Sequence, residues 1–333
     1  MKAPSPISLP QGVRDILPDE ARRIESAAEG ILAVFRRRGF KKIITPLLEY
    51  VDVLSLGMGA NLKDRVLKFI DPFTGRVVAI RPDITSQIAR VVATRMRDYD
   101  LPLKLCYNEN VIRYVGPSRG KSREVLQIGA EYISSEGSAE ADAEMISMAI
   151  ESLIEAGVRD FKIDIGDVEF LKTVLAGLDI EEAVRKDIRD AIALKDFSGL
   201  EEVLDSEGGS LSPGEKKMLL NLTTLYGEKE VFKEAAAFAK EGRTKEVLEN
   251  LQGVFEILTQ KGFGDYVTVD LGEVRGFDYY TGIIFEGFAT GFGKPLLSGG
   301  RYDDLLERYG FRRAATGFAF DMENIVGALE RNG

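Results

Sequence analysis

The sequence predicts an α+β protein built on a mainly antiparallel sheet. Three observations carry this prediction: β-type runs occur in pairs that turns connect, a long block of helix-type sequence interrupts them, and further β-type runs follow. Hairpins that dominate over alternating strand–helix–strand units are typical of this class. At 333 residues, the chain is long enough for one large domain and a smaller part, or for two domains.

The first half of the chain supplies most of the expected hairpins. A helix is expected to open at Pro18 and to end before Gly39, because its apolar residues recur every three or four positions. The next expected elements are a strand at 42–45 that Pro46 ends, hairpin strands at 66–70 and 76–80, a helix at 84–94, hairpin strands at 103–115 and 124–133, a helix at 139–156 and a strand at 161–165.

Residues 168–262 read as almost pure helix, rich in Glu, Lys, Leu and Ala. β-type runs return at 266–271, 283–288 and 315–320, and a last helix begins at Met322. We therefore expect a core made of residues 1–167 and 263–333, interrupted by a helical insertion at 168–262.

Composition excludes several kinds of chemistry. The chain has no histidine, which removes Ser-His-Asp triads, imidazole bases and histidine metal ligands, and its one cysteine, Cys106, excludes an intramolecular disulfide. A net charge of −10 argues against general binding to nucleic-acid backbones. No long uncharged apolar run and no signal-peptide core occur, so we expect no membrane span and a cytoplasmic location, and we expect no metal and no cofactor.

Basic residues gather around the turn of the longer hairpin. Five Lys and Arg face one acid between residues 104 and 123. A Gly/Pro/Ser loop of this kind can aim cations at an anion, although a solvated hairpin tip is the plainer alternative. The anion-binding candidates are Arg113, Arg119, Lys121 and Arg123.

Three further polar groups are candidates for a ligand site. Gln127 and Glu131 lie four residues apart on one strand and therefore on one face, where they suit an ammonium group or simply face solvent. Asp83, at a strand-to-helix junction, could cap the helix or contact a ligand. Residues 274–282 combine Arg275 with Tyr279 and Tyr280, which could frame a flat ligand or belong to the core.

A glycine pair follows in the polar run at 298–303. Gly299 and Gly300 would let the backbone approach a ligand closely.

These clusters, in this order, resemble the catalytic core of class II histidyl-tRNA synthetases over nearly the whole chain. Pro46 matches the motif 1 proline, residues 112–131 match motif 2, and residues 275–282 match the signature of histidine-binding members. The resemblance implies a class II antiparallel sheet flanked by helices. It also implies that histidine is bound by Asp83, Thr85, Gln127, Glu131, Arg275, Tyr279 and Tyr280, with Arg275 near the carboxylate and Arg113 near an ATP α-phosphate.

Departures from the synthetase pattern fall on the ATP side. Val115 and Gly116 replace the Glu and the following Arg of motif 2, and Asn324 replaces the motif 3 Arg that holds the γ-phosphate. Losing one charge-assisted contact costs about 1.5–3 kcal/mol, so we expect neither adenylation nor tRNA charging. Because the sequence ends soon after Asn324, we also expect no C-terminal anticodon-binding domain.

The whole pattern is similar to the family of ATP phosphoribosyltransferase regulatory subunits. The resemblance implies a non-catalytic chain that activates a short catalytic subunit in the first step of histidine biosynthesis and takes histidine as feedback effector. It also implies a hetero-octamer and a homodimer through the class II core. A truncated histidyl-tRNA synthetase and a stand-alone histidine-sensing domain are the alternatives.

Overall fold

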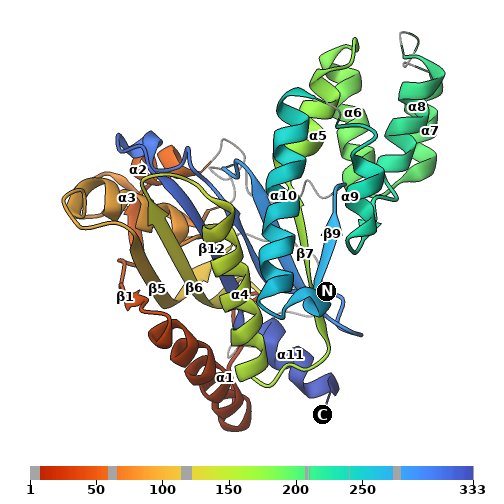
Figure 1. The fold of residues 1–333 in the computed structure, drawn as a ribbon. Coiled ribbons are helices and arrows are strands. Elements are labelled where there is room, and N and C mark those ends of the chain that lie inside the picture. Colours follow the sequence, from red (N-terminus) through yellow and green to blue (C-terminus); the bar gives the residue numbers. More distant parts are fainter. Residues whose placement is uncertain are drawn as a thin grey trace.

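The computed structural model describes residues 8–58, 66–113, 122–206, 209, 211–239, 241–272 and 279–332 (Figure 1). Within these residues the main sheet has nine strands, in the order β1-β5-β6-β12-β11-β10-β7-β9-β8. Only the β1–β5 and β7–β9 pairs of this sheet are parallel, which confirms the predicted antiparallel class. The strands are β1 (Lys41–Lys42), β5 (Leu103–Ile112), β6 (Glu124–Ser134), β7 (Phe161–Asp167), β8 (Tyr226–Gly227), β9 (Val267–Asp270), β10 (Ile283–Ala289), β11 (Pro295–Arg301) and β12 (Ala314–Asp321).

One face of this sheet is covered by helices. The helix α4 (Ala139–Glu155) packs against α1 (Pro18–Arg37) and α10 (Gly242–Gln260), and α11 (Met322–Asn332) packs against α1 (Figure 1). The apolar stripe predicted for α1 points into this layer, where the Phe35 ring lies 5.8 Å from that of Phe318. The opposite face carries α3 (Thr85–Arg95) and a separate apolar cluster.

A second, small antiparallel sheet lies beside α3. It consists of β2 (Leu48–Tyr50), β4 (Val77–Ile80) and β3 (Lys68–Ile70), in that order, and the predicted hairpin is its β3–β4 pair. The short helix α2 (Val51–Gly57) follows β2 directly and was not predicted.

The segment between β7 and β9 is mainly helical, as its composition predicted. Its helices α6, α7 and α8 project away from the main sheet (Figure 1). The segment is not purely helical, because β8 pairs with β9 and extends the sheet by one short strand. Before α10, the helices are α5 (Val168–Ala176), α6 (Glu182–Ala193), α7 (Phe197–Ser206), α8 (Pro213–Leu222) and α9 (Glu230–Ala235).

Two strand predictions differ from the structure. The strand expected at 42–45 is only Lys41–Lys42, because Thr45 turns toward α3 and donates its hydroxyl to Gln87 at 2.7 Å. The strand β11 was missed altogether, since Gly299 and Gly300 had suggested a close approach to a ligand. A Cβ at position 299 would lie 2.6 Å from the carbonyl oxygen of Gly317, so the glycine allows two strands to pack closely.

The single cysteine, Cys106, is a buried residue of β5. Burial raises the pKa of the Cys106 thiol to about 11, so the thiol is protonated at neutral pH and is a poor nucleophile. In the described ranges, no helix combines the length and apolar character that a membrane span requires.

Candidate functional site

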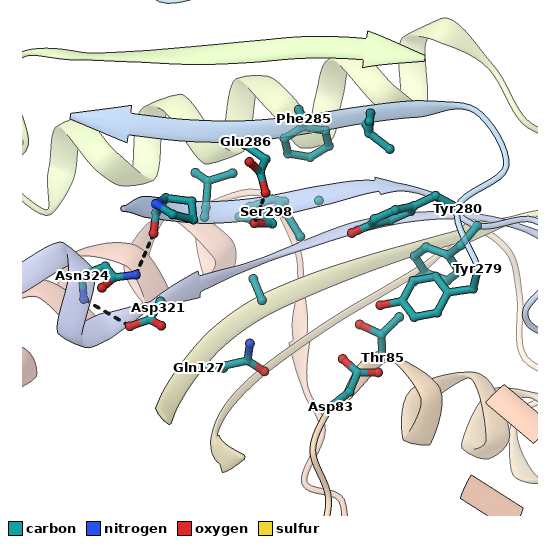
Figure 2. A pocket seen from close by; sticks show the side chains of 18 of the residues that line it. Asp83, Thr85, Gln127, Tyr279, Tyr280, Phe285, Glu286, Ser298, Asp321 and Asn324 are labelled. Carbon is teal, nitrogen blue, oxygen red and sulfur yellow. Dashed lines mark hydrogen bonds between the residues drawn. The ribbon is translucent and has the colours of Figure 1, made fainter. Parts of the chain in front are cut away.

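A cavity of about 320 Å³ opens on the sheet face that carries α3. Six side chains that the sequence nominated from distant segments line it together, and Figure 2 shows five of them. They are Asp83, Thr85, Arg113, Gln127, Tyr279 and Tyr280. The tyrosines lie at one end of the cavity and Asn324 lies at the other (Figure 2).

Asp83 both caps a helix and lines the cavity. Its Oδ2 accepts hydrogen bonds from the backbone N–H of Ser86 at 3.0 Å and from the Ser86 hydroxyl at 2.9 Å. These bonds satisfy the first turn of α3, which is the capping role that the sequence allowed. The carboxylate is buried at the cavity wall, so it supplies negative charge to that wall.

Gln127 carries an acceptor that the protein itself does not use. Its side chain is 6% exposed, and its Oε1 finds no hydrogen-bond partner in the described part of the chain. Leaving a buried acceptor unpaired costs about 1–3 kcal/mol, and such a group in a cavity wall points to a ligand that donates. In the register of β6 with β12, Gln127 stands opposite Asp321.

Glu131 lies directly behind the cavity wall. It is 1% exposed and stands opposite Gly317 in the β6–β12 register. Its Oε1 accepts a hydrogen bond from the Thr85 hydroxyl at 2.7 Å, and its Oε2 accepts one from the hydroxyl of Tyr302. Burial raises the pKa of this carboxyl to about 8, and the two hydroxyl donors oppose that rise.

Three tyrosines frame the same end of the cavity. The Tyr279 ring lies 5.1 Å from Tyr280 and 5.8 Å from Tyr302, in edge-to-face arrangements. Burial raises the pKa of all three phenols, so they are neutral hydroxyl groups at physiological pH. Sequence reasoning missed Tyr302 as a site residue, although it had singled out the polar run around Gly299 and Gly300 that leads to it.

Among the residues that the structure describes, the far end of the cavity offers few of the cations that phosphates need. Asn324 donates its side-chain amide to the carbonyl of Pro295 at 2.8 Å, and its backbone N–H donates to Asp321 Oδ1 at 3.1 Å (Figure 2). Burial raises the pKa of the Asp321 carboxyl, and nearby Arg113 opposes the rise. Of the described residues that line the cavity, only Arg113 is cationic.

Of the other predicted residues, Arg123 is described and is not among those that line the cavity. Arg123 turns toward the N-terminal segment, where its backbone N–H donates to Gly12 at 2.7 Å and its guanidinium to Gln11 at 3.4 Å. Arg119, Lys121 and Arg275 lie outside the described residues, and so do Val115 and Gly116.

Comparison with known sequences identifies the family. A family model described as histidyl-tRNA synthetase matches residues 12–325. A Geobacter sulfurreducens protein named ATP phosphoribosyltransferase regulatory subunit is 45% identical over 97% of this chain and 73% of its own length. One of the same name from Clostridium kluyveri is 38% identical over 98% of this chain and 83% of its own length.

Solved structures agree with the sequences. A Bacillus halodurans structure described as an ATP phosphoribosyltransferase regulatory subunit/histidyl-tRNA synthetase superposes with a TM-score of 0.89 at 33% identity, covering 99% of this chain and 84% of that one. An Alicyclobacillus acidocaldarius histidine–tRNA ligase subunit gives 0.83 at 26% identity, covering 99% of both chains. The chain therefore belongs to the family of ATP phosphoribosyltransferase regulatory subunits, a branch of the histidyl-tRNA synthetase-like class II fold.

Proposed function

We propose that this chain is the non-catalytic regulatory subunit of an ATP phosphoribosyltransferase, active in histidine biosynthesis together with a separate catalytic subunit. The names of its relatives support the role, and the main cavity supports its regulatory ligand. The observation that carries the ligand assignment is the unused Oε1 of Gln127 in the same cavity wall as the buried carboxylate of Asp83.

This pair of groups suits the α-ammonium group of free histidine. An ammonium has three donors and one positive charge, which match an unpaired amide oxygen and a carboxylate. The neutral hydroxyls of Tyr279 and Tyr280 lie at the same end, where they can frame and hydrogen-bond an imidazole. Contact of Arg275 with the carboxylate stays a prediction from the family resemblance.

Mixing this chain with a short catalytic subunit tests the role directly. The transferase rate is expected to rise when both chains are present, and added histidine is expected to lower it. The coupling is allosteric, because histidine that binds one state of the assembly better shifts the population toward that state. The catalytic subunit alone is the control, and a rate that the second chain leaves unchanged would sink the proposal.

No histidine-dependent exchange of pyrophosphate into ATP is expected from the purified chain. The Asn324 amide is engaged with a backbone carbonyl, and no second cation lines the described part of the cavity to hold a triphosphate. A histidyl-tRNA synthetase assayed in parallel is the positive control. Exchange above the blank would instead favour the truncated synthetase, and co-purification without any catalytic subunit would favour a stand-alone sensor.

We infer a homodimer through the small sheet and the segment of residues 43–47 that leads to it. This region exposes several large apolar side chains, which is typical of an interface. The members are Ile44, Leu47, Leu48, Phe69, Ile70, Phe73 and Val77. We further infer that four chains of each kind form a hetero-octamer. We also infer that the chain is divided into a core (1–167 and 263–333) and an insertion (168–262). The cytoplasmic location stays a prediction.

Ile44→Asp is expected to shift the purified chain from dimer to monomer, because a carboxylate in an apolar interface is desolvated without a partner. Sedimentation velocity measures the change. Leu194→Asp is a matched control, since Leu194 is 71% exposed and Ile44 72% exposed, but Leu194 lies outside the small sheet. If both variants sediment like the parent chain, the dimer does not form through this surface.

A further inference from the structure

Burial and a neighbouring carboxylate disfavour the negative charge of Glu131, against the two hydroxyl groups that donate to it. It is buried, and the charged group that acts on it from the described residues is a second carboxylate, Asp83, at the start of α3. The remaining titratable groups that surround it are phenols from β5, from the segment before β10 and from the end of β11. They are Tyr107, Tyr279, Tyr280 and Tyr302.

We propose that Glu131 is a positioning residue that couples ligand binding to the release of a proton. It holds a proton in the empty cavity and gives it to solvent when a cationic amino group binds between Asp83 and Gln127. The positive charge of the ammonium group then takes the place of the proton beside the buried carboxylates, while the α-carboxylate of the ligand lies away from them. This inference rests on the histidine site proposed above and adds its proton linkage.

Hydrogen bonds connect Glu131 to residues of the cavity wall. Both oxygens of Glu131 are held by hydroxyl groups, those of Thr85 and Tyr302, and both of these residues line the cavity. A ligand that reorients either hydroxyl therefore changes the stabilisation of the carboxylate. The carboxylate cannot swing away from the site, because it lies against the bare backbone of Gly317, where any Cβ would overlap its Oε2.

The raised pKa of Glu131 determines how histidine binding should depend on pH. Burial raises the pKa of Glu131 to about 8 in the empty site, so the carboxyl is largely neutral at pH 7. A bound cation lowers that pKa, so binding should tighten as pH rises and level off near about 8, until the α-ammonium group of the ligand loses its own proton and binding weakens again. The affinity for histidine should rise roughly fivefold from pH 7 to pH 8 when binding releases the proton of Glu131 completely. An unperturbed imidazole titrates near about 6.5, below this window.

Isothermal titration of the full chain with histidine at pH 7.5, in phosphate and in Tris, measures the released proton. The binding enthalpy is expected to differ between the buffers by their ionisation heats, and Glu131→Gln, which keeps the size of the side chain, is expected to remove the difference. Equal enthalpies in both buffers, or a difference that survives in Glu131→Gln, would overturn the inference. Absence of any binding would refute the proposed site instead.

A second variant keeps the test independent of how well Glu131→Gln folds. Tyr302→Phe removes one hydroxyl donor from the carboxylate, so the pKa of Glu131 should rise further and the affinity should level off at a higher pH. Tyr226→Phe is the matched control, because the Tyr226 hydroxyl donates to Asp164 at 3.3 Å from β8, the edge strand at the other end of the main sheet. An affinity profile that is the same in both variants would contradict the proton linkage.

Discussion

Asp83→Asn is expected to weaken histidine binding by roughly 10- to 100-fold. A hydrogen bond to a charged group contributes about 1.5–3 kcal/mol, and the substitution removes the negative charge that faces the ammonium group. The asparagine keeps an acceptor oxygen for the first turn of α3, so the fold should survive. Titration calorimetry or the histidine inhibition curve of the reconstituted complex measures the loss.

Ser86→Ala is the matched control for this experiment. It removes the hydroxyl that donates to Asp83 at 2.9 Å but leaves the charge of the cavity wall unchanged. Its affinity for histidine should stay close to that of the parent chain. An Asp83→Asn variant that binds histidine as tightly as the Ser86→Ala variant would remove Asp83 from the site.

Gly317→Ala is expected to damage both the fold and the site. The added methyl group would overlap the Oε2 of Glu131, which has no room to retreat because Thr85 and Tyr302 hold the carboxylate on its other sides. Overpacking a rigid interior costs about 1–3 kcal/mol of unfolding free energy. Denaturant titration measures this loss, and histidine affinity should fall with it because Thr85 and Tyr302 line the cavity.

Gly253→Ala provides the comparison. Gly253 lies within α10, and a Cβ there would meet only Ala139 at 3.9 Å, an ordinary contact. Alanine in a helix interior is favoured over glycine by roughly 0.5–1 kcal/mol, so this variant should be neutral or more stable. If Gly317→Ala were equally stable, Glu131 would have to lie elsewhere in the solution structure.

Local patterns predicted the hairpins and the helical layer because each pattern matches a physical period. Strand alternation put Gln127 and Glu131 on one face, and the helical period identified the buried stripe of α1. The glycines of β11 misled the prediction, because a residue without a side chain signals close approach but not what approaches. Only the pairing of β11 with β12 in the folded chain shows that the close neighbour of these glycines is another strand.

The sequence nominated six of the side chains that line the cavity, but it did not predict how deeply each nominated residue lies. The resemblance nominated both Gln127 and Glu131 as ligand contacts, and their spacing could not separate them. Gln127 lines the cavity, whereas Glu131 lies behind it because a glycine stands opposite it on β12. Tyr302 escaped prediction because its role depends on the partner that the folded chain brings to it, not on its neighbours in sequence.

The nine-stranded sheet ends on both sides in strands of two residues. One edge consists of Lys41 and Lys42, both exposed, and the other of Tyr226 and Gly227. Long, flat edges recruit further strands and lead to fibres, whereas short edges, and those that carry lysines, resist such pairing. The assembly proposed above has a defined size, and the short edges of this sheet disfavour the open-ended addition of copies that a long edge would allow.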